Sequence, residues 1–157
     1  MTNNDILRRI RYTFNFSDDT MITLFSLAEQ QVTRAQVSDW LKKDDDCDFA
    51  ELSDTKLAVF LNGFITYKRG KKDGPQPVPE KTLSNNSIFM KLKIALELKA
   101  EDVLEILAKA GGTISKHELS AFFRRPDHKH YRECNDQILR KFLKGLQLTY
   151  RPAETPG

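Results

Sequence analysis

The sequence predicts an all-α protein built from two homologous four-helix repeats that pack together with approximate two-fold symmetry. Three observations predict this class. Apolar residues recur at the helical period of about 3.6 residues along the chain. No segment alternates apolar and polar residues as a half-buried strand does. Residues 3–64 also align without a gap with residues 85–146 when each residue n is set beside residue n+82.

The internal alignment predicts how the chain is divided. The two stretches share 12 identical pairs in 62 positions, among them Leu57/Leu139 and Phe60/Phe142. Glycines and prolines separate them and disfavour helix there. We therefore expect an acidic first repeat at 1–68, a Pro/Gly-rich linker at 69–83, a basic second repeat at 84–148 and a disordered tail at 149–157.

The first two helices of each repeat are predicted from their apolar faces. Asn3 and Asn4, like Asn85 and Asn86, stand where asparagine can cap the first helix, and Ser17 or Asp18 starts the second. The apolar faces are Ile6, Leu7, Ile10 and Phe14, then Met21, Ile22, Leu24, Phe25 and Ala28, with counterparts Ile88, Phe89, Leu92 and Leu96, then Val103, Leu104, Ile106, Leu107 and Ala110.

The third helix carries the clearest local signal. Thr33 precedes Gln36 by three positions and Ser115 precedes Glu118 by three, so each repeat has a capping box at the same place. Trp40 and Leu41, or Phe122 and Phe123, then turn inward, and Pro126 marks the stop in the second repeat.

The fourth helix starts at Ser53 or Asn135. Gly63 and Gly145 lie inside it, where glycine costs about 0.5–1 kcal/mol relative to alanine. They predict a close approach of two helices, and a ligand contact is the alternative. The apolar faces are Leu57, Phe60, Leu61 and Phe64, and Leu139, Phe142, Leu143 and Leu146.

Composition excludes several classes of protein. The chain has 157 residues, of which 39% are hydrophobic and 30% charged, as in soluble globular proteins. No apolar run approaches the roughly 18 residues of a membrane-spanning helix, and the start lacks the apolar segment of a secretory signal. Two cysteines rule out a disulfide framework. We expect a cytoplasmic protein with no membrane partner.

No motif of catalysis is present, so we expect no enzyme and no cofactor. The sequence lacks a nucleophile elbow, a P-loop, a zinc-protease helix and a dinucleotide-binding turn. His117, His128, His130 and Cys134 are metal-ligand types. Their spacing is not a standard zinc pattern, however, and their counterparts are Ala35, Asp46, Asp48 and Leu52. We therefore predict no metal site.

Acidic residues recur at matching positions around the segment between the third and fourth helices. The run 44–51 lacks the central glycine and terminal glutamate of an EF-hand, so a solvated loop is expected. The recurring acids are interpreted as structural, because first-turn acids suit the helix dipole and the others can hold the loop. The recurring positions are Asp45, Glu51 and Asp54 with Gly63, and Asp127, Glu133 and Asp136 with Gly145.

The small net charge of +3 hides an uneven division between the repeats. Residues 1–64 hold 7 Lys/Arg against 11 Asp/Glu, whereas residues 85–146 hold 12 against 8. Basic side chains neutralise phosphates, so the second repeat is a candidate nucleic-acid-binding surface of a regulatory module, and its second and third helices loosely resemble a helix-turn-helix. The candidate residues are Lys116, Arg124, Arg125, His128, Lys129, His130 and Arg132.

Two other interpretations of the charge division stay open. Opposite charges on the repeats can drive interaction with a protein partner or self-association into a homo-oligomer. The charges can also simply keep two surfaces solvated.

The chain also resembles a known family along almost its whole length. NND-I-L-R at the start, FLNGFI and KRGK before the linker, NNSI-F-MKLKIAL after it and RRPDHKHYRECNDQILRKFLKGL near the end resemble the YehS-like family of small bacterial proteins. The resemblance implies a bacterial cytoplasmic protein with a duplicated domain. It implies no known activity, cofactor or catalytic residue.

Overall fold

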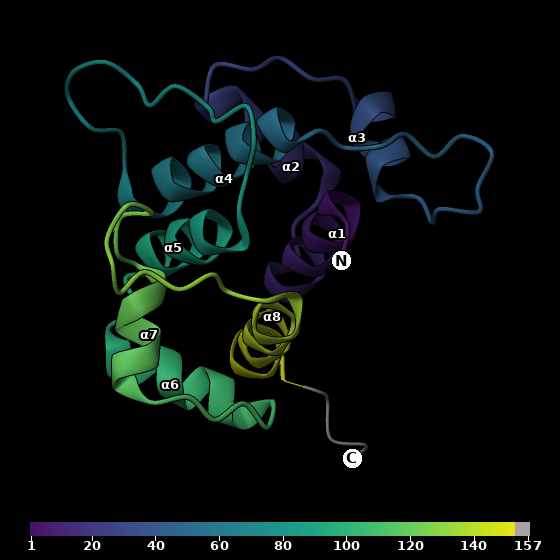
Figure 1. Ribbon diagram of the computed structural model, residues 1–157. Helices are drawn as coiled ribbons and strands as arrows, with labels where there is room; N and C mark the ends of the chain where they lie inside the picture. Colours follow the sequence, from purple (N-terminus) through teal and green to yellow (C-terminus); the bar gives the residue numbers. More distant parts are fainter. Residues whose placement is uncertain (153–157) are drawn as a thin grey trace. The chain divides into compact units, whose positions relative to one another are not determined.

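The computed structural model describes residues 1–152 and contains eight α-helices and no strand in that range (Figure 1). The chain divides between Leu83 and Ser84 into two compact units, called repeat one and repeat two below. The all-α prediction and the duplication are therefore confirmed, since each unit holds four helices in the same order. The tail predicted from residue 149 starts too early, because the last helix includes Thr149 and Tyr150. Residues 153–157 of that predicted tail lie outside the described residues.

The helices of the two repeats correspond one to one. In repeat one, α2 packs most extensively on α4, and in repeat two α6 packs most extensively on α8. Repeat one consists of α1 (Asn3–Phe14), α2 (Asp18–Leu27), α3 (Arg34–Leu41) and α4 (Asp54–Arg69); repeat two consists of α5 (Asn85–Ala95), α6 (Ala100–Lys109), α7 (Lys116–Phe122) and α8 (Asp136–Tyr150).

Side-chain caps fix most of the helix starts. Both predicted capping boxes are confirmed: in α3 the Gln36 amide nitrogen donates to Thr33 Oγ1 at 3.1 Å, and in α7 the Glu118 amide nitrogen donates to Ser115 Oγ at 3.0 Å. The prediction that asparagines cap α1 and α5 is wrong. The N-cap residues are Thr2 and Ser84, and the asparagines lie inside the first turn.

The first-turn asparagines instead form hydrogen bonds with the end of the third helix and with the segment that joins it to the fourth helix of the same repeat. Asn4 Nδ2 donates to the carbonyls of Trp40 and Ala50 at 2.9 Å each, and its Oδ1 accepts the Leu52 amide at 3.0 Å. Repeat two has the same three bonds at n+82, from Asn86 to Phe122 (3.0 Å), Arg132 (2.8 Å) and Cys134 (2.9 Å). Each asparagine therefore holds one backbone carbonyl at the end of α3 or α7 and two backbone groups of the segment that follows, at the same positions in both repeats.

The two cores fill equivalent space with exchanged side chains. In repeat one, the ring of the buried Phe25 lies 5.4 Å from that of Phe60, and the counterpart of Phe89 is the buried Leu7. Repeat two has the reverse arrangement, in which Phe89 stacks on Phe142 at 4.1 Å and a leucine replaces the equivalent of Phe25. The summed side-chain volume at these two positions is the same in both repeats, because the phenylalanine and the leucine have exchanged places.

The two internal glycines lie where the long helices approach each other. A Cβ built on Gly63 would lie 1.7 Å from the backbone oxygen of Leu24, and one on Gly145 would lie 2.1 Å from that of Ile106. Real Cβ atoms do not approach backbone oxygens this closely, so any side chain would push α4 from α2 or α8 from α6.

The linker contains no helix between Arg69 and Asn85. Gly70 and Gly74 adopt positive φ angles of 85° and 94°, which L-residues with a Cβ rarely adopt. At its end, the Leu83 amide donates to Asp54 Oδ2 at 2.9 Å. Within residues 1–152, no helix is both long and apolar enough to cross a membrane.

Candidate functional site

The segments that follow α3 and α7 have equivalent backbone hydrogen bonds but carry different charges. We call residues 42–50 the acidic loop and residues 124–132 the basic loop. In the acidic loop the Asp48 amide donates to Asp46 Oδ1 at 2.8 Å, and in the basic loop the His130 amide donates to His128 Nδ1 at 3.0 Å. An aspartate and a histidine therefore hold the same turn at positions 82 residues apart.

The basic side chains of the two loops differ in their partners. Lys42 Nζ lies 2.7 Å from Asp39 Oδ1 and 3.9 Å from Asp48 Oδ2, and the hydrogen bond with Asp39 holds the pKa of Lys42 above its usual value. Arg124 occupies the equivalent position in repeat two. There the counterparts of the two carboxylates are Ala121 and His130, so Arg124 has neither acidic partner.

Most other predicted nucleic-acid-binding residues also lie on the basic loop. The exposed Arg125 side chain pairs with Asp127 at 3.3 Å, and Lys116 begins α7 and pairs with Glu101 at 2.9 Å. Within residues 1–152, the side chains of Arg124, Lys129 and Arg132 form no ion pair within 4.0 Å. Arg124 is half-buried, and the other six members of the predicted set are exposed, namely Lys116, Arg125, His128, Lys129, His130 and Arg132.

Part of the basic loop forms the wall of a shallow pocket against α7. The pocket has a volume of about 260 Å³. The Glu118 carboxylate is in its lining, and Oε1 of that carboxylate accepts the Ser115 amide at 3.3 Å. Burial raises the pKa of the hydroxyl of Tyr131, which is also in the lining. The complete lining is His117, Glu118, Ala121, Lys129, His130, Tyr131 and Arg132.

The histidines and Cys134 do not converge on one point. Cys134 is 4% exposed and belongs to the core, whereas the histidines lie on the surface. Burial raises the pKa of the Cys134 thiol to about 12, so it stays protonated. The rings of His128 and His130 lie 5.6 Å apart, and Nδ1 of His128 already accepts a backbone hydrogen bond.

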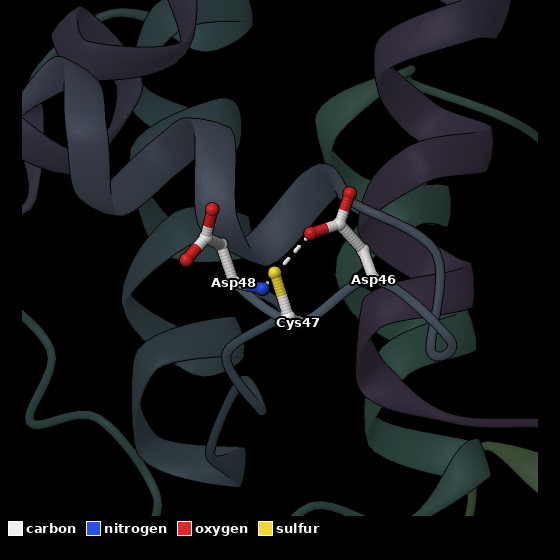
Figure 2. Close-up of side chains that lie close together, drawn as sticks. All are labelled: Asp46, Cys47 and Asp48. Carbon is white, nitrogen blue, oxygen red and sulfur yellow. Dashed lines mark hydrogen bonds between the residues drawn. The ribbon is translucent and has the colours of Figure 1, made fainter.

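The acidic loop contains a different set of ligand-type side chains. Asp46, Cys47 and Asp48 are exposed neighbours whose oxygen and sulfur atoms lie within 4.8 Å of one another, the one such group of three in residues 1–152. Figure 2 shows the Asp46 carboxylate directed toward the backbone nitrogen of Asp48, the bond that closes the turn. Three exposed residues in sequence, one of them already holding the loop, are typical of a solvated turn.

The recurring acidic residues have two kinds of surroundings. Asp45, Glu51, Asp127 and Glu133 are exposed on the loops. Asp54 and Asp136 instead begin α4 and α8, where their Oδ1 atoms accept the side-chain amides of Asn3 and Asn85, both at 2.7 Å. The hydrogen bond from Asn85 holds the pKa of Asp136 below its usual value.

Sequence reasoning missed two features of the site. Glu118 and Tyr131 were not among the candidate residues, although both line the pocket beside Lys129 and Arg132. The sequence predicts the role of a cap alone for Glu118 and no role for Tyr131. Both residues could have been identified from the length of α7. Because this capped helix has only seven residues, the basic loop follows shortly after Glu118 in the sequence.

Comparison with known proteins identifies relatives along nearly the whole chain. The family model described as a protein of unknown function (DUF1456) matches residues 3–70 and 85–151, which is one match to each repeat. The uncharacterized protein YehS of Escherichia coli (strain K12) is 42% identical over 147 residues, covering 93% of this chain and 94% of the relative. No solved structure matches. These matches confirm the resemblance found in the sequence, and the chain belongs to the DUF1456 family of proteins of unknown function.

Proposed function

We propose that this protein is a non-enzymatic, regulatory binding module whose basic loop binds the phosphates of a nucleic acid. One observation carries the proposal. Arg124 has lost both carboxylates that neutralise its counterpart Lys42, and Lys129 and Arg132 beside it also form no ion pair within residues 1–152. The half-buried Arg124 and the exposed Lys129 and Arg132 therefore remain available to bind an external anion.

The fixed backbone of the basic loop supports the same proposal. Arg132 is held at both backbone polar groups, because its carbonyl accepts Asn86 Nδ2 at 2.8 Å and its amide donates to the Ala121 carbonyl at 3.2 Å. A loop whose backbone is already ordered loses less conformational entropy when it binds a ligand.

Fluorescence anisotropy with labelled DNA and RNA tests this function. We expect binding at about 50 mM salt that weakens steeply as salt rises, because phosphate neutralisation releases counterions. Arg124→Ala combined with Arg125→Ala should remove most of the binding and lower the salt slope by about two. The matched control is Lys42→Ala with Lys43→Ala, which changes the aligned positions of repeat one and should bind as the wild type. Undetectable binding to single-stranded and duplex DNA and RNA at about 50 mM salt would refute the proposal.

A second candidate function is self-association through the two loops. It is favoured by their shared backbone and opposite charge, since an acidic loop on one copy complements a basic loop on another. Light scattering should then find a dimer or larger species that dissociates as salt rises. Asp46→Lys with Asp48→Lys should abolish that species without weakening nucleic-acid binding. A monomer at every concentration would exclude this candidate.

A further inference from the structure

The geometry of α7 argues against the insertion of a recognition helix into a duplex groove. The helix has seven residues, which is about 10 Å of length. It is separated from α6 by residues 110–115, whereas a helix-turn-helix uses a turn of about three to four residues. Most of the candidate cations lie on the basic loop after α7, and Glu118 lies on α7 itself.

The pocket beside the basic loop has the chemistry of a site for one unstacked base. Three of its lining residues carry planar rings, His117, His130 and Tyr131. Aromatic and imidazole rings are the side chains on which single-stranded bases stack. The pocket volume of about 260 Å³ is near the lower end of small-ligand pockets, which suits a single base better than a larger ligand.

Glu118 distinguishes a base from a phosphate as the occupant. A carboxylate in the lining repels a phosphate, but it accepts hydrogen bonds from the amino group of a base, such as that of cytosine. Oε1 of Glu118 accepts the Ser115 amide, and the second oxygen has no hydrogen-bond partner among the described residues. That second oxygen is therefore available to a base.

We propose that the protein binds single-stranded nucleic acid, with one unstacked base in the pocket between α7 and the basic loop and the flanking phosphates on Lys129 and Arg132. This proposal rests on the function proposed above and specifies its ligand. The base stacks on the rings of His130 and Tyr131, and the Glu118 carboxylate accepts its amino group.

Repeat one lacks most of this chemistry at the equivalent positions. His117 corresponds to Ala35, Glu118 to Gln36 and His130 to Asp48. Phe49 replaces Tyr131, but the surrounding loop is acidic and repels phosphates. Binding is therefore expected from repeat two alone, which gives matched control positions in the same chain.

The first test compares strands of equal length and sequence by anisotropy on the full chain. We expect the single strand to bind at least about fivefold more tightly than the duplex. His130→Ala, at an exposed position, and Tyr131→Leu, which keeps an apolar side chain, should each weaken single-strand binding by about fivefold without changing the salt slope. Phe49→Leu is the matched control and should leave binding unchanged. Thermal unfolding of each variant separates loss of a contact from loss of fold.

The second test concerns the base edge. We expect oligo(C) to bind more tightly than oligo(U), because both are pyrimidines and cytosine alone presents the amino group. Glu118→Gln should remove this preference. The variant keeps the cap, since in repeat one the Gln36 Oε1 atom accepts the Thr33 amide at 2.8 Å.

The outcomes separate this proposal from the one on which it rests. Equal binding of single strand and duplex, or unchanged affinity in both His130→Ala and Tyr131→Leu, overturns the base pocket while leaving the phosphate contacts standing. An oligo(C) preference that persists in Glu118→Gln overturns the role of that carboxylate. Absence of all nucleic-acid binding overturns both proposals.

Discussion

At the scale of single residues, the buried asparagines Asn4 and Asn86 have the largest consequences. Each is at most 7% exposed and uses both amide hydrogens and its oxygen. Three backbone groups, one at the end of α3 or α7 and two in the segment that follows, depend on each side chain for hydrogen bonds. Asn86 therefore acts on the candidate site indirectly, because one of its partners is the Arg132 carbonyl.

Asn86→Ala should lower the free energy of unfolding by about 2–4 kcal/mol, because it leaves buried backbone groups without partners. Asn85→Ala is the comparison, since Asn85 is less buried and makes two side-chain hydrogen bonds, and a smaller loss is expected. Chemical denaturation measures both. A loss for Asn86→Ala below about 0.5 kcal/mol would show that water replaces these bonds.

The two cysteines are expected to differ in reactivity. Cys47 is exposed, whereas Cys134 is buried with a thiol pKa raised to about 12. A thiol reagent at neutral pH should label Cys47 rapidly and Cys134 only after denaturant is added, because the thiolate is the reactive form. Cys47→Ser should then leave almost no rapid labelling. Rapid labelling of two thiols in the native protein would contradict the burial of Cys134.

At the scale of elements, the packing of α8 on α6 and of α4 on α2 depends on two glycines. Glycine is unfavourable inside a helix, and both positions nevertheless carry it because a backbone oxygen occupies the space of a Cβ. Repeated use of the same device indicates that the helix pair existed before the duplication.

Gly145→Ala should destabilise the protein by about 1–3 kcal/mol, because the cost of forcing α8 from α6 exceeds the gain in helix propensity. Gln137→Ala, on an exposed position of the same helix, should change stability by less than about 0.5 kcal/mol. Thermal and chemical unfolding provide the measurement. Stabilisation by Gly145→Ala would mean that the two helices separate without cost.

At the scale of the whole molecule, the two repeats have the same order of helices but opposite net charge. The loops keep the same backbone bonds, while Asp39, Asp46 and Asp48 have become Ala121, His128 and His130. Surface charge can diverge in this way because it is almost independent of the buried contacts that fix the fold. A unit of about 62 aligned residues is also near the lower limit for an independent core, which is why we expect the repeats to pack together.

Small-angle scattering tests that expectation. A compact chain of 157 residues should have a radius of gyration of about 15 Å. Asp46→Lys with Asp48→Lys should leave this value unchanged if packing depends on apolar contacts. A value markedly above 15 Å in a monomer would mean that the repeats move separately.

The helical class, the duplication, the capping boxes and the apolar faces could all be predicted from the order of the residues. These are local or periodic features: Thr33 and Gln36 are three residues apart, and Leu57, Phe60, Leu61 and Phe64 lie on one side of any helix they form. Even the mistaken assignment of Asn4 as a cap followed a correct local preference.

The role of Asn4 became visible in the folded chain, because its hydrogen-bond partners lie 36 to 48 residues away in the sequence. The same holds for the site. His117 and Glu118 share a pocket with Tyr131 because α7 ends and the chain returns past it, whereas Cys134 is withdrawn into the core. Contacts between distant segments depend on the path of the whole chain, and residue spacing does not encode that path.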